Sequence, residues 1–376
     1  MGSGTLSTES EQKNPMKKPN IRNNIAVLDI GKTHAKVILF DAYNLKELEV
    51  FQTENFILTN SLYPHFDIDS LKNFIISSLS SIAEKYLVDS IFTSTHGACV
   101  ALMSKGELAL PVIDYEFDGP DKLKSEYDRI RPSFNQTGSP RMSAGLNLGA
   151  QLYWQYKYFP KEFAKIDQIL FWPQYWTYWL TGICASEISY ATCHSDLWDI
   201  KENKFVELKT FGIESDISFP PIKSASNILG NLRKELANKT GLSENTSVYC
   251  GAHDSSLALV SAYLKQELPC SILSTGTWVT LFSLGSNQID ISEKPGLMIS
   301  CDCFGNLVPN FRFPGGKIYE RQISKKNKSS FNHENINISD ISLIDFEDIE
   351  KARFVNKASN EEINFHDIES NKAEAI

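Results

Sequence analysis

The sequence lacks the features that mark membrane, secreted and nucleic-acid-binding proteins. No apolar run approaches the roughly 18 residues of a membrane-spanning helix, and the polar stretch 1–20 has no apolar centre of the kind found in signal peptides. Lys and Arg number 37 against 46 Asp and Glu, a net charge of −9, whereas nucleic-acid or membrane surfaces are met by basic patches. We therefore expect a cytoplasmic protein with no nucleic-acid partner and no membrane partner.

Cysteine gives no sign of a disulfide framework or a metal site. The seven cysteines are odd in number and lie mostly in apolar segments, so buried free thiols are expected. Cys301 and Cys303 are one residue apart, but no second ligand pair lies nearby in the sequence, which argues against zinc. A Gly-x-Ser-x-Gly nucleophile elbow and a Gly-x-Gly-x-x-Gly turn after a strand are also missing. A hydrolase or a dinucleotide-dependent dehydrogenase is therefore not expected.

The remaining composition is that of an α/β protein with two domains. The 376 residues are 42% apolar and 22% charged, which is ordinary for a globular chain of this size. Hydrophobic periodicity predicts single strands over 45–56, 88–95 and 247–250, and pairs of strands within 25–41, 98–113, 272–284 and 297–313. It predicts helices over 67–86, 146–159, 169–180, 228–239 and 257–264.

The first hairpin, over 25–41, carries polar groups at its turn. Its first strand ends on Asp29, and Gly31, Lys32 and Thr33 follow as a tight turn with a cation and a hydroxyl. Exposed backbone N–H groups and a Lys can neutralise phosphate oxygens, and a carboxylate can bind a metal ion. The same pattern also fits a plain hairpin whose turn is polar.

His96 and the segment 192–196 also carry polar groups next to apolar segments. His96 ends an apolar strand and precedes Gly97, and strand ends of α/β sheets are where ligands bind. It either hydrogen-bonds a substrate hydroxyl or is satisfied by a backbone carbonyl. Thr192, His194, Ser195 and Asp196 are close enough in sequence to contact a ligand together, although adjacent Ser and His residues are no evidence for a catalytic triad.

Asp254 lies at a strand-to-helix turn, in Gly-x-x-Asp. Its carboxylate would be among the unpaired N–H groups of a helix start, either as a simple N-cap or as a general base. A second glycine-containing turn, at Thr275, Gly276 and Thr277, joins the two strands predicted within 272–284. Two such turns far apart in the chain suggest a duplicated domain with two phosphate-facing turns.

Several segments together resemble the FGGY carbohydrate kinases, a branch of the actin, hexokinase and heat-shock ATPase fold. Residues 28–37 (LDIGKTHAKV) look like the first phosphate motif of this family, and residues 274–278 (STGTW) look like its second phosphate motif. Residues 251–256 (GAHDSS) are similar to the segment that holds the catalytic aspartate. Residues 95–98 (THGA) are similar to the substrate-contacting turn of xylulose-kinase-like members, and 173–182 match a helix that ends in Leu-Thr-Gly. The order and spacing of these motifs over 24–316 are specific.

The resemblance implies an ATP-dependent kinase of a ketose or related polyol, with ATP and Mg²⁺ as cofactors. Asp254 would be the general base and would contact the sugar together with His96 and Gly97, and Asp29 would orient Mg²⁺. Gly31, Lys32 and Thr33 from one turn, and Thr275, Gly276 and Thr277 from the other, would hold the nucleotide phosphates. Little covalent help is needed for phosphoryl transfer beyond such positioning. The motifs do not distinguish among sugars, because specificity depends on a few hydroxyl contacts on several loops.

The resemblance also divides the chain into four parts. Residues 1–21 would be a disordered extension, 22–264 the N-terminal sugar-binding domain, 265–316 the start of a C-terminal nucleotide-binding domain, and 317–376 a polar, disordered tail. Family members continue for about a hundred further residues, so this chain looks like a shortened member with an incomplete second domain. The alternative to a kinase is therefore a catalytically impaired relative that binds a sugar or a protein partner.

Overall fold

The structure is a computed structural model that describes residues 23–215, 217, 219–275, 279–286, 288–313 and 315, together with the strands 341–344 and 353–356. The extension predicted over 1–21 lies outside these residues, as does most of the tail predicted over 317–376. The polar composition of the tail predicts no regular structure, yet β19 (Ile341–Ile344) pairs antiparallel with β20 (Arg353–Asn356).

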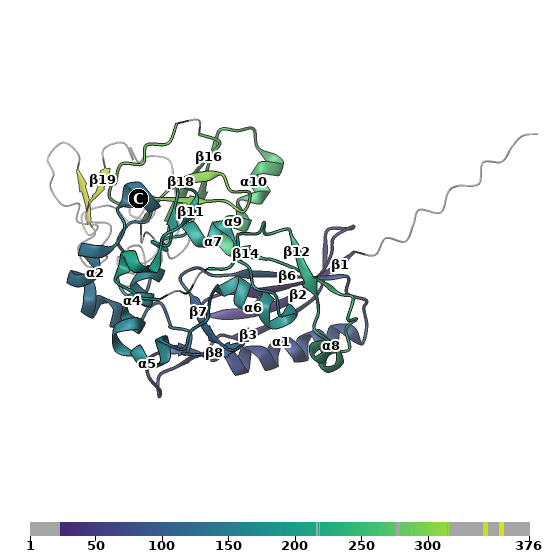
Figure 1. Ribbon diagram of the computed structural model, residues 1–376. Helices are drawn as coiled ribbons and strands as arrows, with labels where there is room; N and C mark the ends of the chain where they lie inside the picture. The colour runs from purple at the N-terminus through teal and green to yellow at the C-terminus, as the bar shows by residue number, and fades with distance from the viewer. Residues whose placement is uncertain are drawn as a thin grey trace, which may run out of the picture.

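A seven-stranded mixed sheet, here called the first sheet, forms the centre of the molecule (Figure 1). Strand β6 lies in the middle and runs parallel to β1, β13 and β14, whereas β2, β3 and β12 run antiparallel to their neighbours. In spatial order the sheet contains β12 (Ile228–Asn231), β13 (Ser247–Tyr249), β6 (Ser90–Thr95), β1 (Asn24–Ile30), β2 (His34–Asp41) and β3 (Lys46–Glu54), with β14 (Ala252–His253) also paired to β6.

The two faces of the first sheet differ because side chains alternate along each strand. Alternate residues of β1 and β2, including Leu28 and Val37, are fully buried. Helices α1, α6 and α8 pack together nearby, with Lys72 of α1 over the ring of Tyr175 in α6. Asp29 and Lys36 belong to the other, half-buried set, so the polar groups of the hairpin lie on the less covered face.

Helices and short 3₁₀ segments surround the sheet. The helices are α1 (Ile68–Ala83), α2 (Lys124–Ile130), α3 (Phe134–Thr137), α4 (Leu148–Tyr158), α5 (Pro160–Phe163), α6 (Trp172–Thr181), α7 (Ile188–Thr192), α8 (Lys234–Thr240), α9 (Asp254–Ala258) and α10 (Val260–Lys265); the 3₁₀ segments are η1 (Gly119–Leu123) and η2 (Leu208–Phe211). Helix α1 begins where the sequence predicts, because the Asp67 side chain accepts a hydrogen bond from the N–H of Ser70. No described helix is long and apolar enough to cross a bilayer.

A four-stranded antiparallel sheet, here called the second sheet, lies above the first in Figure 1. Its order is β15 (Cys270–Ser274), β16 (Val279–Leu284), β18 (Leu307–Phe313) and β17 (Leu297–Cys301). Helix α7 and strand β14 lie between the sheets, and α7 contacts both β14 and β17. The hairpin predicted within 272–284 and the strands predicted within 297–313 are confirmed.

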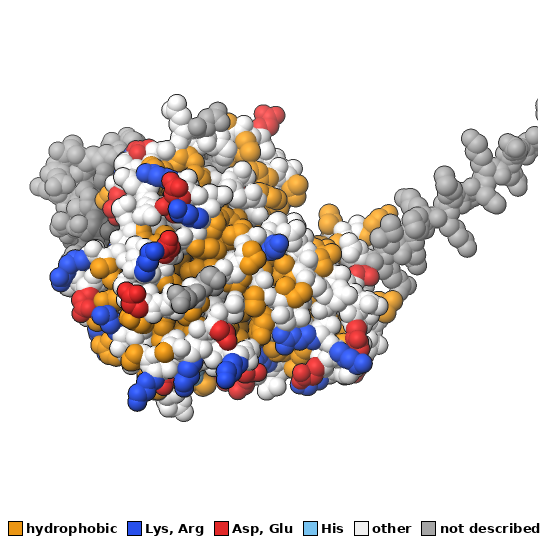
Figure 2. All heavy atoms as spheres, in the orientation of Figure 1, with side chains coloured by type: hydrophobic (Ala, Val, Ile, Leu, Met, Phe, Trp, Pro, Cys, Tyr) orange, Lys and Arg blue, Asp and Glu red, His pale blue; other side chains and the backbone are white. Residues whose placement is uncertain are grey.

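Three smaller sheets complete the described chain. They pair β8 (Glu107–Leu108) with β7 (Val100–Ser104) and β9 (Gln168–Phe171), β4 (Ile57–Leu58) with β5 (His65–Phe66), and β10 (Trp198–Asp199) with β11 (Lys204–Phe205). All seven cysteines are free thiols, as the sequence predicts. Figure 2 shows charged side chains of both signs along the lower edge and left side of one face, whereas apolar atoms gather across its middle.

Two predicted helices are wrong over part of their length. Residues 169–171 belong to β9, which pairs with β7, and the helix begins only at Trp172, with Pro173 in the first turn, where a missing N–H costs little. Residues 228–231 form β12 against β13, since sheet pairing outweighs helical periodicity next to Gly230. Helix α8 then starts at Lys234. The helix predicted over 257–264 begins earlier, at Asp254, and divides into α9 and α10.

Candidate active site

A pocket of about 260 Å³ lies between the two sheets. One wall comes from the first sheet and the segments that follow its strands: His96, Gly97, Ala98, His253, Asp254 and Ser255, with Cys193 and His194 after α7. The other wall comes from the second sheet: Thr280, Phe282, Met298, Ser300, Asn310 and Arg312. The predicted residues His96, Gly97 and Asp254 therefore meet at one pocket.

Asp254 is positioned by the end of β14. Strand β14 pairs parallel with β6, with His253 opposite Thr95, so Asp254 follows at the carboxyl edge of the sheet. Gly251, which precedes β14, has a φ of +73°, and a side chain there would collide with the carbonyl of Thr93. The Asp254 carboxylate accepts hydrogen bonds from the Ser255 N–H at 2.5 Å and from the Ser255 hydroxyl at 3.1 Å, and its Oδ1 is 3.3 Å from Nε2 of His253. It is not an N-cap in this arrangement, because it is the first helical residue of α9.

Asp29 lies at the same edge of the sheet, on the other side of β6. In register, Asp29 of β1 and Ala252 of β14 are both opposite Ser94 of β6. Partial burial and the negative charge of Asp254 raise the pKa of Asp29, and Lys36 opposes this shift. The two carboxylates are thus close enough to repel each other, which is a setting that a cation would relieve.

Lys36 is a functional candidate that the sequence analysis missed. It is the cross-strand partner of Asp29 in the first hairpin, and its positive charge lowers the pKa of that carboxyl. The signal was available, since residues opposite each other in a hairpin share a face.

His96 has one fixed nitrogen and one free nitrogen. Its Nδ1 is 2.7 Å from the carbonyl oxygen of Gly97, so Nδ1 carries the donated proton. Its Nε2 is buried and has no hydrogen-bond partner. Burial lowers the pKa of His96 to about 4, so the imidazole is neutral at physiological pH and its Nε2 offers a lone pair. The contact with a backbone carbonyl is therefore present at Nδ1, and a contact of Nε2 with a substrate hydroxyl stays a prediction.

Gly97 allows two further imidazoles to approach. A Cβ at Gly97 would lie 3.0 Å from Nε2 of His253 and 3.6 Å from Nε2 of His194. Burial lowers the pKa of His253, but the negative charges of Cys193 and Asp254 outweigh burial and raise it to about 9. Burial raises the pKa of the Cys193 thiol, but His194 and His253 bring it well below its usual range.

The first predicted phosphate turn is beside the pocket rather than in its lining. The N–H of Gly31 donates to the carbonyl of His34 at 2.9 Å, which closes the turn. The Lys32 ammonium forms an ion pair with Asp114 and lies 3.7 Å from Glu116. Thr33 is exposed. A phosphate contact by Lys32 would therefore compete with two carboxylates.

The second predicted phosphate turn falls partly outside the described residues. Thr275 is exposed at the end of β15, and Gly276 and Thr277 lie outside the described chain. The sequence analysis missed the polar residues on the second-sheet wall, Thr280, Ser300, Asn310 and Arg312, because each lies within a strand and no turn or glycine marks it.

The donor set fits Mg²⁺ bound jointly by protein and phosphate. Among the described residues, no group of three or more His, Cys, Asp or Glu side chains is arranged to hold a metal ion alone. Mg²⁺ in phosphoryl-transfer sites needs only one or two carboxylates, with substrate phosphate and water as the other ligands. Asp29, half-buried and facing another carboxylate, fits that role.

Comparison with known proteins gives matches along most of the described chain. Residues 121–261 match the N-terminal domain of the FGGY family of carbohydrate kinases, and 267–344 match the FGGY C-terminal domain. The chain is 25% identical over 283 residues to L-fuculokinase of Escherichia coli (strain K12), covering 71% of this chain and 58% of that protein. It is 26% identical over 282 residues to rhamnulokinase of Ligilactobacillus salivarius, covering 71% of this chain and 54% of that protein.

Solved structures agree with this match. A carbohydrate kinase from Novosphingobium aromaticivorans superposes with a TM-score of 0.74 at 32% identity, covering 81% of this chain and 65% of that one. Glycerol kinase of Plasmodium falciparum with ADP gives a TM-score of 0.69 at 17% identity, covering 81% of this chain and 64% of that one. At this identity the likeness is one of fold alone. The chain thus spans 58% of the first of these kinases and 65% of the Novosphingobium chain.

Proposed function

Since the chain belongs to the FGGY family of carbohydrate kinases, with the two domain models together matching more than half of its residues, we propose that it transfers a phosphoryl group from ATP to a hydroxyl of a ketose or related polyol. The observation that carries the proposal is the placement of Asp254 beside the pocket and within Coulombic reach of Asp29. The fold is the actin/hexokinase-like α/β fold of these sugar kinases.

Asp254 is proposed as the general base. The attacking hydroxyl would lie in the pocket with its proton toward the Asp254 carboxylate, which is ionisable, partly exposed and fixed at a helix start. Proton acceptance by a positioned carboxylate is the main covalent assistance that phosphoryl transfer needs. Nε2 of His96 would accept a hydrogen bond from another sugar hydroxyl, because it is a buried nitrogen of a pocket-lining residue and has no protein partner.

Asp29 is proposed to hold Mg²⁺, which when bound would neutralise charge on the transferred phosphate. Gly31, Lys32 and Thr33 on one side, and Thr275, Gly276 and Thr277 on the other, remain proposed phosphate contacts. The division at residue 265 into a sugar-binding and a nucleotide-binding domain is proposed on the same basis, since the pocket has one wall from each sheet. A cytoplasmic location stays a prediction from the sequence.

The proposal is tested by ADP release with MgATP and a panel of L-fuculose, L-rhamnulose, D-xylulose and glycerol. We expect one or more of these to raise ADP release at least tenfold above the sugar-free rate, only with Mg²⁺, and to give a phosphorylated product. Sugar binding by calorimetry without any sugar-dependent ADP release would favour the impaired sugar-binding relative instead. Neither binding nor turnover would overturn the assignment of this pocket.

A further inference from the structure

His194 lies on the pocket wall in an unusual backbone conformation. Its φ is +40°, and that of Asp196 is +63°, both in the left-handed region that non-glycine residues seldom adopt. Such conformations persist where surrounding contacts fix them, and they gather at ligand-binding sites.

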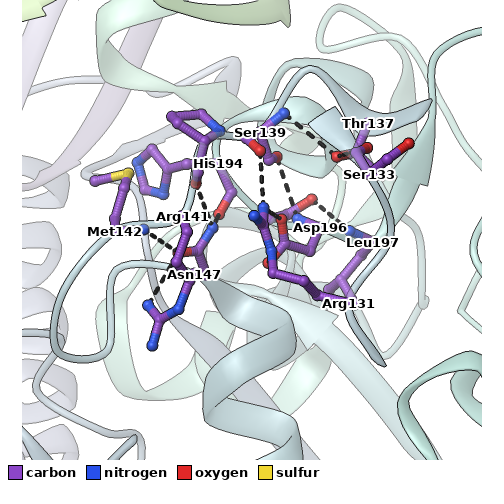
Figure 3. A network of polar contacts seen from close by, with 12 residues as sticks. Arg131, Ser133, Thr137, Ser139, Arg141, Met142, Asn147, His194, Asp196 and Leu197 are labelled. Atoms are coloured by element: carbon purple, nitrogen blue, oxygen red, sulfur yellow. Dashed lines mark hydrogen bonds and ion pairs between the residues drawn. The ribbon is translucent and has the colours of Figure 1, made fainter. Parts of the chain in front are cut away.

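A buried polar network holds this segment (Figure 3). The Asp196 carboxylate is fully buried and accepts from the Arg131 guanidinium at 2.7 Å and from the Tyr127 hydroxyl at 2.7 Å. Arg131 also donates to the carbonyl of Ser139 at 2.8 Å, and the Ser139 hydroxyl accepts from the N–H of Asp196 at 3.2 Å. These contacts, here called the Arg131–Asp196 network, fix the backbone two residues after His194.

A second set of contacts fixes His194 itself. The Asn147 amide donates to the carbonyl of His194 at 3.2 Å and to that of Pro140 at 3.0 Å. Nδ1 of His194 is 2.6 Å from the carbonyl oxygen of Leu146. Because a carbonyl only accepts, Nδ1 donates its proton to Leu146, and Nε2 is the ring nitrogen left to face the pocket.

The orientation of the ring places Nε2 on the side of the pocket. Nε2 of His194 is on the side of Gly97, where Nε2 of His253 also lies, 3.3 Å from Oδ1 of Asp254. His96, His194 and Asp254 thus face one pocket, and Nδ1 of each imidazole is fixed by a backbone carbonyl. Side chains that can accept hydrogen bonds on this wall suit a ligand with several hydroxyl groups.

We propose that His194 is a sugar-binding, specificity-determining residue whose Nε2 accepts a hydrogen bond from a substrate hydroxyl other than the one that Asp254 deprotonates. The Arg131–Asp196 network is its positioning device. The inference rests on the proposed function, since it takes the ligand of this pocket to be a sugar. It adds the residue that distinguishes one hydroxyl configuration from another.

Two matched variants separate the recognition role from a structural role. In His194→Asn, the side-chain amide N–H can replace Nδ1–H toward Leu146, but nothing replaces Nε2. In His194→Gln, the amide oxygen extends to the position of Nε2, but the bond to Leu146 is lost. If His194 recognises the sugar, His194→Asn should weaken sugar binding more than His194→Gln does. If the role of His194 is structural, His194→Gln should be the more damaging substitution.

The probes are the four 2-pentuloses, which differ only in the configuration of the C3 and C4 hydroxyls, together with L-fuculose and L-rhamnulose. Binding is measured by calorimetry without nucleotide. We expect His194→Asn to weaken binding of the preferred sugar about tenfold or more, the effect of one lost hydrogen bond. It should also reduce the preference at one carbon to within about threefold, with the melting temperature unchanged. His194→Gln should retain more affinity than His194→Asn.

Asp196→Asn tests the positioning role. We expect a rise in KM with kcat nearly unchanged, and the same loss of preference at one carbon that His194→Asn causes. If His194→Asn binds the preferred sugar as tightly and as selectively as the wild-type protein does, this inference is overturned, while the kinase proposal stays intact. Absence of binding of every probe to the wild-type protein would overturn both.

Discussion

The two sheets supply opposite walls of one pocket, yet strand β1 of the first and strand β15 of the second are buried to very different extents. In β1 of the first sheet, alternate residues are fully buried, including Leu28 with 0% of its surface exposed. In β15 of the second sheet every residue is at least partly exposed, and Leu273 has 61% of its surface exposed. The carboxylates and imidazoles proposed for chemistry thus belong to the well-packed body. The sheet with fewer buried contacts supplies hydroxyl, amide and guanidinium groups, and elements of low packing are those that move most readily.

The largest difference between the two walls should appear in catalysis. We expect Asp254→Asn to lower sugar-dependent ADP release about 10²–10⁴-fold, or about 3–5 kcal/mol of activation free energy, because the amide cannot accept the hydroxyl proton. Ser300→Ala on the opposite wall is the matched control, with an expected loss of tenfold or less. Equal losses in the two variants would contradict the assignment of the chemistry to the first-sheet wall.

Packing should differ almost as strongly. We expect Leu28→Ala to lower the free energy of unfolding by about 2–5 kcal/mol, because it leaves a cavity in a closed core. Leu273→Ala should change it by less than about 0.5 kcal/mol, because that side chain is mostly in water already. Urea unfolding followed by tryptophan fluorescence is suited to the first measurement, since five of the six tryptophans lie around the first sheet: Trp154, Trp172, Trp176, Trp179 and Trp198.

Hydrogen exchange of β15 completes the Leu273 comparison, since fluorescence reports mainly on the first sheet. The amides of β15 should exchange at similar rates in Leu273→Ala and in the wild-type protein. A loss of stability from Leu273→Ala as large as that from Leu28→Ala would show that the second sheet is packed as tightly as the first.

The seam between the sheets should respond to pH through Glu187. This carboxyl is fully buried at the start of α7, where it accepts from the Tyr190 N–H at 3.2 Å and the Ser189 hydroxyl at 2.5 Å. Burial raises the pKa of Glu187 to about 7, although these hydrogen bonds oppose the shift. The folded protein therefore keeps a proton that the unfolded chain releases near its ordinary pKa of about 4.5, so this contribution to stability falls as pH rises from about 4.5 to 7.

We expect Glu187→Gln, which is neutral throughout, to remove this decrease and to be more stable than the wild type at pH 8 by up to about 3 kcal/mol. Unfolding free energies measured at pH 5, 6, 7 and 8 check the slope. Glu235→Gln, on the exposed surface of α8, is the control and should leave the slope over this range unchanged. A Glu187→Gln curve parallel to that of the wild type would show that the carboxyl is ionised in the folded protein.

How much could be predicted from the sequence also differs between the sheets. Around the first sheet, alternating β-branched residues and a local cap predict the first hairpin and α1, and Asp29, His96 and Asp254 lie at glycine-marked strand ends. The errors at 169–171 and 228–231 arose where short apolar runs adjoin helices and only a distant partner strand decides their conformation.

The second-sheet wall could not be predicted because its site residues have no local signal. Ser300 and Asn310 lie within strands, and they reach the pocket only because β17 and β18 pair and the second sheet packs near α7. Likewise, the sequence places Asp196 near His194 but gives no sign of Arg131, which lies 65 residues earlier and forms the buried ion pair. Contacts between residues so far apart depend on tertiary packing that periodicity does not describe.

The smallest expected effect concerns the bonds that attach the second sheet. The N–H of Cys301 in β17 donates to the hydroxyl of Thr192 in α7 at 2.7 Å, and the N–H of Ile299 donates to the carbonyl of Gly138 at 2.9 Å. Thr192→Val keeps the shape of the side chain but removes the acceptor and leaves the buried Cys301 N–H unpaired. The local cost of such a group is about 1–3 kcal/mol.

We expect this cost to appear as faster hydrogen exchange of the Cys301 amide, by about tenfold or more, with the exchange of β1 and β6 unchanged. The effect should remain local because the core of the first sheet does not depend on this bond, whereas β17 contacts α7 through it. Thr192→Ser keeps the hydroxyl and is the control, with exchange close to that of the wild type. Faster exchange throughout β1 and β6 in Thr192→Val would mean that the two sheets unfold as one cooperative unit, and the contrast between them would then be one of exposure and not of stability.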